Sequence, residues 1–396
     1  MKRVLIIGAS ILQLPAIIKA KEMGYYVAVL DYNPKAVGIP YADEYFNIST
    51  IDVEGVAKAA QDWGADGIMT LATDMPMRAV AKACETLGLN GISYETAVKA
   101  TDKGEMIKAF EAHGVAHPWY YVAPDPASFK EIADKVAFPC IMKPTDNAGS
   151  RGVVKCHDAL ELRNAYDYAR GESRGGAVIV EECLEGPEFS VEVLVTGGVP
   201  HVIQITDKRT TGAPHFVEMG HSQPTCQNSE NREKIRDLAC RAVKAVGITT
   251  GPAHVELILT DEGPKMVELG ARLGGDCITT HLVPLSTGVD MVGATIRLAC
   301  GEDVSIAPKW DKGAAIAYFD ACNGVIRSIE GVEEARQMPG VKELSIVHQV
   351  GERIGEIRNS VDRIGFVIAQ GETAEEAIQI CRKAMQTVRI EISRDA

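Results

Sequence analysis

Two glutamates in a predicted β-hairpin have the spacing best suited to chemistry in this sequence. Residues 254–272 read as two strands of alternating apolar and polar residues, joined by a turn at Asp261-Glu-Gly263. A turn centred on Glu262 places Glu256 opposite Glu268. Directly opposed carboxylates lie about 5 Å apart and destabilise a sheet, unless they share a proton or hold a cation between them. Mg²⁺ suits such a site because it combines one or two carboxylates with substrate phosphates.

The remaining residues of the hairpin support this register. His254 falls opposite Gly270, and Arg272 follows two positions further along the same face. The other face is apolar and carries Val255, Leu257, Leu259, Val267 and Leu269. A shift of the register by one residue would turn those apolar side chains to water. We therefore favour opposed carboxylates over the alternative of a solvated strand face.

A lysine followed by a glycine-containing loop forms a second candidate site. Lys143 lies at the end of the predicted strand 138–144, and the loop 145–153 contains Gly149 and Gly152. The backbone amides of such a loop can hold phosphate oxygens beside a lysine. The loop lacks the Walker spacing, so an ordinary surface turn explains this segment equally well.

The order of the predicted elements supplies the scaffold that must position these residues. Residues 4–30 read as strand, helix and strand, and the alternation continues to about residue 100, which predicts a doubly wound α/β domain. Residues 101–310 mix strands and helices less regularly, as an α+β region with a lid does. Residues 311–396 read as short strands followed by a helix over 373–388.

Charge and composition narrow the class of protein. The 396 residues include 41 Lys and Arg against 54 Asp and Glu, which gives a net charge of −13. This balance disfavours nucleic-acid and membrane-surface partners, because both require a basic face. The sequence has no apolar run of about 18 residues, and its ten cysteines form no Cys-x-x-Cys pair. We therefore expect small-molecule substrates, no membrane contact, no zinc site and a cytoplasmic location.

A nicotinamide-dependent dehydrogenase is the alternative that the N-terminal segment suggests. Asp31 ends the second predicted strand, at the place where dinucleotide-binding folds hold a ribose. The preceding turn, Gly8-Ala-Ser-Ile-Leu-Gln, lacks the G-x-G-x-x-G spacing. We therefore disfavour NAD binding.

Taken together, the motifs resemble the ATP-grasp superfamily of carboxylate–amine ligases over nearly the whole chain. They are Asp-Lys-x-x-Met at 102–106, Ile-Met-Lys-Pro at 141–144, Glu-Glu-Cys-Leu-Glu-Gly-Pro-Glu at 181–188, and the paired-glutamate hairpin followed by Ala-Arg-Leu-Gly-Gly. The L-amino acid (dipeptide) ligase branch is the most similar, and the segments 324–326 and 362–369 resemble it too.

The resemblance implies an ATP-grasp fold of α/β and α+β parts. It would comprise an N-terminal doubly wound pre-ATP-grasp domain (1–100), a central ATP-grasp domain with a lid and a catalytic core (101–310, lid about 115–187), and a small C-terminal α+β domain that completes the core (311–396). ATP would lie between the two α+β subdomains of the central domain.

The resemblance also implies a set of nucleotide contacts. Lys103 and Lys143 would contact the α- and β-phosphates, and the loop 147–153 would close over the triphosphate. The backbone of the linker 182–184 would meet the adenine edge, and Glu188 would hold the ribose hydroxyls. The complete set comprises Lys103, Lys143, Gly149, Ser150, Gly152, Val153, Glu181, Glu182, Leu184 and Glu188.

The implied reaction is an ADP-forming ligation. The carboxylate of an amino acid or a related small acid attacks the γ-phosphorus of MgATP, and an amine then attacks the acyl phosphate to give an amide. Lys143 and Arg272 are the candidate catalytic residues, since a guanidinium can hold two oxygens of a phosphate or oxyanion at once. Glu256 and Glu268 would ligate one or two Mg²⁺ ions, with Mn²⁺ as an alternative. The enzyme is expected to be a homodimer.

Further residues are candidates for the substrate side. Gly274 and Gly275 would let the backbone approach the substrate carboxylate. His254 could orient a ligand or substrate, or be a structural histidine. His215 and His221 lie in a loop that could border the substrate.

One position departs from the family pattern. Many members carry Glu-x-Asn where this chain has Glu268-Leu-Gly270, and that Asn assists the second metal. The glycine offers no side-chain ligand, so the second metal is left open and a weakly active nucleotide sensor becomes an alternative. Another ATP-grasp ligase, similar to glycinamide ribonucleotide synthetase or to a carbamoylating enzyme, shares every nucleotide motif and stays open as well.

Overall fold

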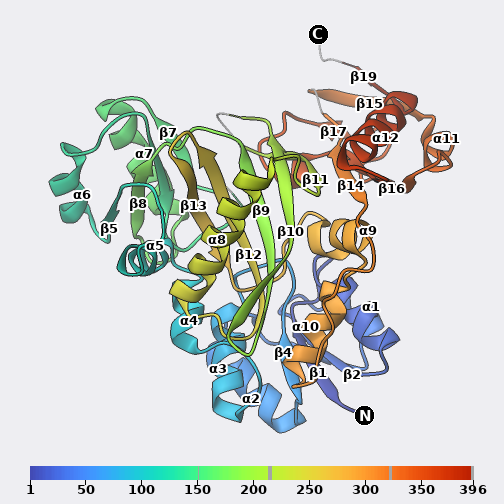
Figure 1. Ribbon diagram of the computed structural model, residues 1–396, viewed down its shortest axis with the longest axis horizontal. Coiled ribbons are helices and arrows are strands. Elements are labelled where there is room, and N and C mark those ends of the chain that lie inside the picture. The colour runs from blue at the N-terminus through green and yellow to red at the C-terminus, as the bar shows by residue number, and fades with distance from the viewer. Residues whose placement is uncertain (150, 213–215, 321–322, 394–396) are drawn as a thin grey trace.

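Figure 1 shows the computed structural model of the protein, which describes residues 1–149, 151–212, 216–320 and 323–393. Within these residues the strands form four sheets. Figure 1 shows the N-terminal part (blue) below the central strands, the segment from α5 to β8 (cyan to green) at their left, and the C-terminal part (orange to red) at their upper right.

The N-terminal part is a parallel sheet with helices on both faces. Its elements are β1 (Arg3–Ile7), α1 (Leu14–Glu22), β2 (Tyr26–Leu30), β3 (Glu44–Phe46), α2 (Val53–Trp63), β4 (Gly67–Met69), α3 (Met77–Leu87) and α4 (Tyr94–Lys99), with a 3₁₀ turn at Ile39–Tyr41. The strand order is β3-β2-β1-β4, and all neighbours are parallel. Val4 and Ile6 of β1 join one apolar cluster, and Leu5 and Ile7 join another. A strand buried on both faces needs a continuous apolar run, and the predicted doubly wound arrangement is confirmed.

The second sheet forms a lid beside the central strands. Helix α5 (Lys103–Ala112) precedes it and packs in the core cluster. The elements of the lid are β5 (Tyr120–Ala123), α6 (Pro126–Ala133), β6 (Cys140–Pro144), β7 (Val154–Cys156), α7 (Ala159–Glu172) and β8 (Val178–Glu182). The strands pair antiparallel in the order β5-β8-β6-β7. The two helices α6 and α7 close its core through the stacked rings of Phe129 and Tyr166, whose centroids are 3.9 Å apart. This confirms the α+β character predicted for the lid.

The third sheet is the largest and carries the candidate site. Its elements are β9 (Glu188–Thr196), β10 (Val199–Thr210), β11 (Glu218–Gln223), α8 (Ser229–Val246), β12 (Gly251–Thr260) and β13 (Gly263–Gly270), followed by a π-helical turn (Ile278–Leu282), α9 (Val283–Thr287) and α10 (Met291–Ala299). The amphipathic helix α8 covers one face, where Ile235 and Leu238 pack in the same cluster as Val193 and Val255. That face anchors the strands from behind and leaves the polar face to the site.

The C-terminal part continues this sheet. Its elements are β14 (Gly313–Tyr318), β15 (Gly324–Glu330), α11 (Val332–Arg336), β16 (Val341–Ile346), β17 (Arg353–Ile354), β18 (Gly365–Gly371), α12 (Ala374–Thr387) and β19 (Arg389–Ser393), with a 3₁₀ turn at Ser360–Asp362. The eight strands run in the order β13-β12-β9-β10-β11-β14-β18-β16, while β17-β15-β19 form the fourth sheet. The C-terminal part thus completes the core sheet, as the resemblance implied. The division at residues 100 and 310 stays a prediction.

Among the residues that the structure describes, no helix combines the length and the apolar character that a membrane span needs.

The junction between β14 and α12 makes a stability prediction. A Cβ at Gly313 would lie 1.9 Å from the backbone carbonyl carbon and oxygen of Thr373, atoms that cannot swing aside. We expect Gly313→Ala to lower the free energy of unfolding by about 2 kcal/mol. Gly171 in α7 is the control, because a Cβ there meets no heavy atom within 4 Å, and its replacement by Ala should be neutral or stabilising by up to about 1 kcal/mol. Urea titration measures both, and equal midpoints would contradict the prediction.

Candidate active site

The two glutamates of the hairpin face each other as predicted. Glu256 pairs with Glu268, and His254 pairs with Gly270, across β12 and β13. The turn itself differs from the prediction, because Thr260 pairs with Gly263 and the loop has only two residues. A bulge between Glu256 and Leu257 then restores the register at the glutamates.

The bulge changes which residue of β13 enters the core. Met266 is buried at 1% exposure, whereas Val267, predicted to face the core, is half-buried and lines a cavity. The other predicted core residues of the hairpin, Val255, Leu257 and Leu269, are buried, and Leu259 packs partly buried against them. The prediction for Val267 was wrong, because it assumed an unbroken alternation from the turn to Glu256.

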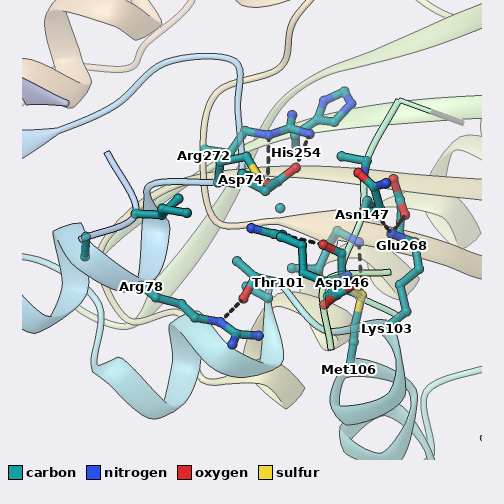
Figure 2. A pocket seen from close by; sticks show the side chains of 18 of the residues that line it. Asp74, Arg78, Thr101, Lys103, Met106, Asp146, Asn147, His254, Glu268 and Arg272 are labelled. Atoms are coloured by element: carbon teal, nitrogen blue, oxygen red, sulfur yellow. Dashed lines mark hydrogen bonds and ion pairs between the residues drawn. The ribbon is translucent and has the colours of Figure 1, made fainter. Parts of the chain in front are cut away.

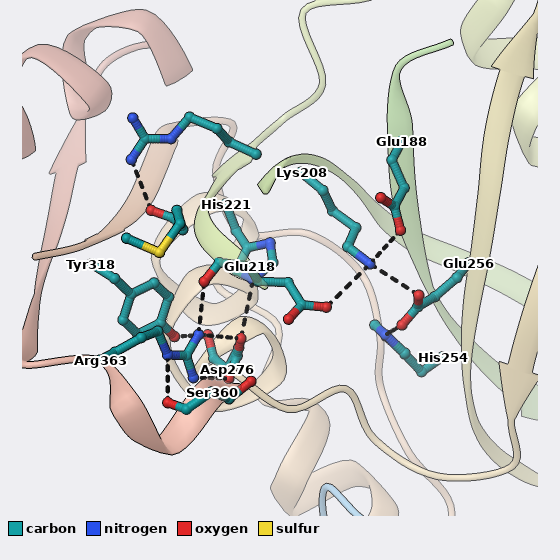
Figure 3. Close-up of polar contacts among 12 residues, drawn as sticks. Glu188, Lys208, Glu218, His221, His254, Glu256, Asp276, Tyr318, Ser360 and Arg363 are labelled. Atoms are coloured by element: carbon teal, nitrogen blue, oxygen red, sulfur yellow. Dashed lines mark hydrogen bonds and ion pairs between the residues drawn. The ribbon is translucent and has the colours of Figure 1, made fainter. Parts of the chain in front are cut away.

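Cations from other elements compensate the two glutamates. The Nζ atom of Lys208 lies 2.9 Å from Glu256, and the Nζ atom of Lys103 lies 2.9 Å from Glu268. Burial alone would raise the pKa of Glu256, but Lys208 and His254 hold it well below the usual value. Burial likewise opposes ionisation of Glu268, and Lys103 lowers its pKa below the ordinary value. Both side chains are therefore carboxylates, and a shared proton does not relieve their repulsion. Figure 2 shows Lys103 beside Glu268, and Figure 3 shows Lys208 beside Glu256.

A buried glutamate on the neighbouring strand holds His254. Its Nδ1 lies 2.6 Å from Glu192, which is fully buried, and its Nε2 lies 3.1 Å from Glu256. Burial alone would lower the pKa of His254, but the charge and hydrogen bond of Glu192 raise it to about 9. The imidazolium therefore donates to both carboxylates at neutral pH and orients Glu256. A Cβ at Gly274 would lie 2.7 Å from Nδ1 of His254, so the glycine makes room for this pair.

Lys208 is a central residue that sequence reasoning missed. It lies on β10 with only 3% of its side chain exposed, and contacts Glu188 and Glu256 at 2.9 Å and Glu218 at 3.7 Å (Figure 3). Burial disfavours the ammonium, but Glu256 and Glu188 raise the pKa of Lys208 well above its usual value. A permanent positive charge thus lies between the predicted ribose ligand and a predicted metal ligand.

The lid and the core sheet enclose a cavity of about 250 Å³, here termed the lid cavity. Apolar side chains of Ile141, Met266 and Val267 line it together with most of the predicted nucleotide-binding residues. Those predicted residues are Lys103, Lys143, Gly149, Val153, Glu181, Glu182, Leu184 and Glu188. An apolar slot that ends in charged groups suits a flat base attached to phosphates.

Several of these residues have partners of their own in the lid cavity. Lys143 and Glu181 form a buried ion pair at 2.5 Å. The amide of Glu182 donates to the carbonyl oxygen of Trp119, so this amide is not free to meet a ligand. Its carboxylate pairs with Lys265 at 3.3 Å.

The two glycines of the loop 145–153 lie in different surroundings. Gly149, at φ +69°, lines the lid cavity. Gly152, at φ +77°, lies outside that lining and packs tightly, since a Cβ there would lie 2.9 Å from Glu172 and Pro144. Ser150 and His215 lie outside the described residues.

A second cavity of about 430 Å³ adjoins the lid cavity and is termed the arginine cavity after Arg78, Arg174 and Arg272 in its lining. Both cavities have Lys103, Asn147, Ala148, Glu256 and Glu268 in their walls. The opposed glutamates therefore form part of the boundary between the two spaces.

Arg272 is held by a residue of the N-terminal part. Its Nε and Nη2 donate to the two carboxylate oxygens of Asp74 at 3.0 and 3.1 Å (Figure 2). A Cβ at Gly270 would lie 2.4 Å from Asp74 Oδ1. The Asp74 carboxylate thus fills the space in which a side chain at position 270 would begin, which explains the glycine at this departure from the family pattern.

The other candidates for the substrate side lie further away. Neither Gly274 nor Gly275 lines either cavity, and the same is true of His221 among the described residues. His221 instead lies 3.5 Å from Asp276, which receives two hydrogen bonds from Arg363 at 2.8 and 2.9 Å. Arg363 also lies 3.7 Å over the ring of Tyr318, so this cluster fastens the C-terminal part to the core (Figure 3).

The donor set fits a magnesium ion that is shared with a nucleotide. No cluster of three or more His, Cys, Asp or Glu suited to hold a metal occurs within the described part of the chain. Two opposed carboxylates beside lysines are instead what Mg²⁺ uses when phosphate oxygens complete its shell. Glu256 and Glu268 are the residues that would hold it.

Comparison with known proteins agrees with this geometry. Residues 136–280 match the ATP-grasp domain family, and residues 317–393 match L-amino acid ligase C-terminal domain 2. An uncharacterized protein of Sinorhizobium fredii, y4rH, is 29% identical over 87% of this chain and 69% of its own length. Alanine–anticapsin ligase of Bacillus subtilis is 26% identical over 75% of this chain and 67% of its own length. The crystal structure of an L-amino acid ligase from Bacillus licheniformis shares the fold, with a TM-score of 0.85, 24% identity and coverage of 100% and 99% of the two chains.

The glutamate pair makes the first prediction about activity. Glu268→Gln removes one of the two charges that would hold Mg²⁺, so we expect kcat for ATP turnover to fall at least about a hundredfold. Asp261→Asn is the matched control, because it removes a carboxylate from the exposed turn of the same hairpin. Steady-state ADP release measures both variants. Near wild-type turnover by Glu268→Gln would show that the hairpin is not a metal site.

The close approach of Gly270 and Asp74 makes a second prediction. Gly270→Asn restores the residue common in the family, yet we expect it to lower the free energy of unfolding by about 1–3 kcal/mol, because its Cβ overlaps Asp74. Asp74→Ala removes the clash, so the double variant should be less destabilised than the sum of the single variants. Urea titration of the four proteins measures the coupling, and strict additivity would contradict this account of the glycine.

Proposed function

Since this chain belongs to the ATP-grasp superfamily and carries the C-terminal domain of L-amino acid ligases, we propose that it joins the carboxylate of an amino acid to an amine and forms ADP and phosphate. The observation that carries this proposal is the shared wall of Glu256 and Glu268. A nucleotide in the lid cavity would direct its phosphates at this wall, and a carboxylate substrate in the arginine cavity would meet them there.

The first step is attack of a substrate carboxylate oxygen on the γ-phosphorus of ATP. The bond between the γ-phosphorus and the β,γ-bridging oxygen breaks, ADP leaves, and an acyl phosphate forms. Such a transfer depends mainly on alignment and on neutralising charge. Mg²⁺ bound by Glu256 and Glu268 would neutralise phosphate charge. Lys103 and Lys143 each hold one carboxylate in the resting site and can exchange it for phosphate oxygens.

The second step is attack of the amine nitrogen on the acyl carbon. The carbon–oxygen bond to phosphate breaks, inorganic phosphate leaves, and the nitrogen loses a proton as the amide forms. Arg272 is proposed to hold the oxyanion, since its guanidinium lies in the arginine cavity beside the glutamate wall. Its bidentate bond to Asp74 keeps the guanidinium in place until that charge develops.

An amino acid as the acid substrate has two supports. The alanine–anticapsin ligase relative is named for joining an amino acid. Asp74 offers a carboxylate next to Arg272, which suits the ammonium group that such a substrate carries beside its carboxylate. A homodimer and a cytoplasmic location remain predictions from the resemblance.

The alternatives receive less support. The sensor hypothesis rested on the glycine at position 270, and the Asp74 carboxylate accounts for that residue. The dehydrogenase hypothesis needed a free Asp31, but its carboxylate accepts hydrogen bonds from the amides of Ala9 and Asn33, each at 2.9 Å. Other ATP-grasp ligases share the nucleotide site, and only the substrates distinguish them.

A panel of amino acids tests the proposal. We expect ADP release that requires Mg²⁺, an amino acid and an amine, with one ADP and one phosphate formed per amide bond. Hydroxylamine in place of the amine should give a hydroxamate, which reports the acyl phosphate directly. Tight ATP binding without turnover on any substrate would instead indicate a sensor, and NADH-linked absorbance changes without ATP would indicate a dehydrogenase.

A further inference from the structure

The arginine cavity contains a partly buried cation that has no acidic partner. Arg272 is paired with Asp74, and Lys103 is paired with Glu268. Arg78 lines the same cavity, but within the described part of the chain no carboxylate lies within ion-pair distance of it. Arg174 differs from Arg78, since it is exposed on the lid and donates to the backbone carbonyl of Asp146.

A single hydrogen bond fixes the direction of Arg78. Its Nε donates to the hydroxyl oxygen of Thr101 at 2.7 Å, and that hydroxyl donates in turn to the carbonyl oxygen of Ala97 at 2.7 Å. Figure 2 shows Arg78 reaching from its helix to Thr101, on the side of the cavity away from Glu268. Its two terminal nitrogens have no hydrogen-bond partner among the described residues and can form a fork for a planar anion.

The position of Arg78 in its helix is electrostatically unfavourable. It is the second residue of α3 (Met77–Leu87), and a cation in the first turn of a helix is disfavoured by the helix dipole. No carboxylate lies within ion-pair distance of it in the part of the structure described. A ligand anion would supply the missing partner.

The proposed reaction has one carboxylate for which no cation has yet been assigned. The carboxylate that reacts lies at the glutamate wall, beside Arg272. If the amine substrate is itself an amino acid, it keeps a carboxylate that would otherwise face Asp74, Asp146 and the two glutamates in the wall of this cavity. Such a group needs a cation on the side away from that wall.

Resting on the proposed ligase function, we propose that Arg78 binds the carboxylate that the amine substrate retains, and so makes amino acids preferred over simple amines as acceptors. Thr101 positions Arg78, and its guanidinium forms a bidentate pair with that carboxylate. Ile51, Met75 and Tyr94 line the same cavity and supply an uncharged surface for the rest of the acceptor.

A dipeptide product tests the contact between Arg78 and this carboxylate separately, because the only free carboxylate of the dipeptide is the one from the amine substrate. The probes are L-alanyl-L-alanine and L-alanyl-L-alaninamide, titrated calorimetrically into the protein with MgADP present. The wild-type protein should bind the dipeptide about tenfold to a hundredfold more tightly than its amide, as expected for a hydrogen-bonded charge pair. Equal affinities, or no binding of either probe, would overturn the proposal.

Variants assign the preference to Arg78. Arg78→Met should reduce the ratio of the two affinities to about one, and Arg78→Lys should retain part of it because a lysine keeps the charge but not the fork. Lys82→Met is the control, since it removes a cation from the same helix outside the cavity. MgADP affinity should match that of the wild type in all three variants, and a cooperative thermal transition should show that each variant is folded. An unchanged ratio in Arg78→Met would overturn the proposal.

Kinetics separate this proposal from the proposed function. With saturating ATP and acid substrate, Arg78→Met should raise KM for an amino acid acceptor tenfold or more, with little change of KM for its carboxamide. If ADP release depends on amino acids but the KM values do not respond to Arg78→Met, the ligase function stands and the role of Arg78 is wrong. If no amino acid elicits ADP release, the ligase function itself fails.

Discussion

The mutual repulsion of Glu256 and Glu268 is the constraint on which the rest of the site depends. Two ionised carboxylates that face each other in a partly buried sheet require nearby positive charge. Separate elements supply it: Lys103 from α5, Lys208 from β10 and His254 from β12. A charge balance built from lysines is reversible, because each ammonium can exchange a protein carboxylate for a phosphate oxygen. The resting site is thus neutralised without being blocked.

This charge balance extends into the packing around the site. A buried ion pair is stable only if its partners approach closely and meet no unpaired polar group. Gly270 and Gly274 permit this approach, since a Cβ at the first would touch Asp74 and a Cβ at the second would touch His254 and Glu192. Both glycines therefore leave the space that these ion pairs occupy.

The pairing of Glu256 with Glu268 was predicted correctly because two errors in the predicted hairpin compensated each other. The prediction assumed a three-residue turn, whereas the structure has a two-residue turn followed by a bulge, and the sum restores Glu256 opposite Glu268. The doubly wound N-terminal part was predictable because buried strands give continuous apolar runs. The role of Lys208 was not predictable. Without a bulge, the pairing of Val199 with Thr196 would extend along β9 and β10 to place Asp207 opposite Glu188. The bulge between Val202 and Gln204 shifts this register by one residue, so that Lys208 lies opposite Glu188 instead. The alternation of apolar and polar residues in a sequence does not reveal where a bulge interrupts a strand.

The roles of Asp74 and Arg78 could not be predicted from the sequence for a different reason. Both come from the N-terminal part, far in sequence from the glutamates, and only tertiary packing brings them to the arginine cavity. The lid and the core sheet line the lid cavity, the proposed nucleotide site, and its lysines suit a triphosphate. On the proposed substrate side, Asp74 and Arg78 come from the N-terminal part and Arg272 comes from the core. Because Arg78 comes from the N-terminal part and makes no ion pair with Glu256 or Glu268 among the described residues, a substitution there can alter the proposed acceptor preference without disturbing the charge balance at the two glutamates.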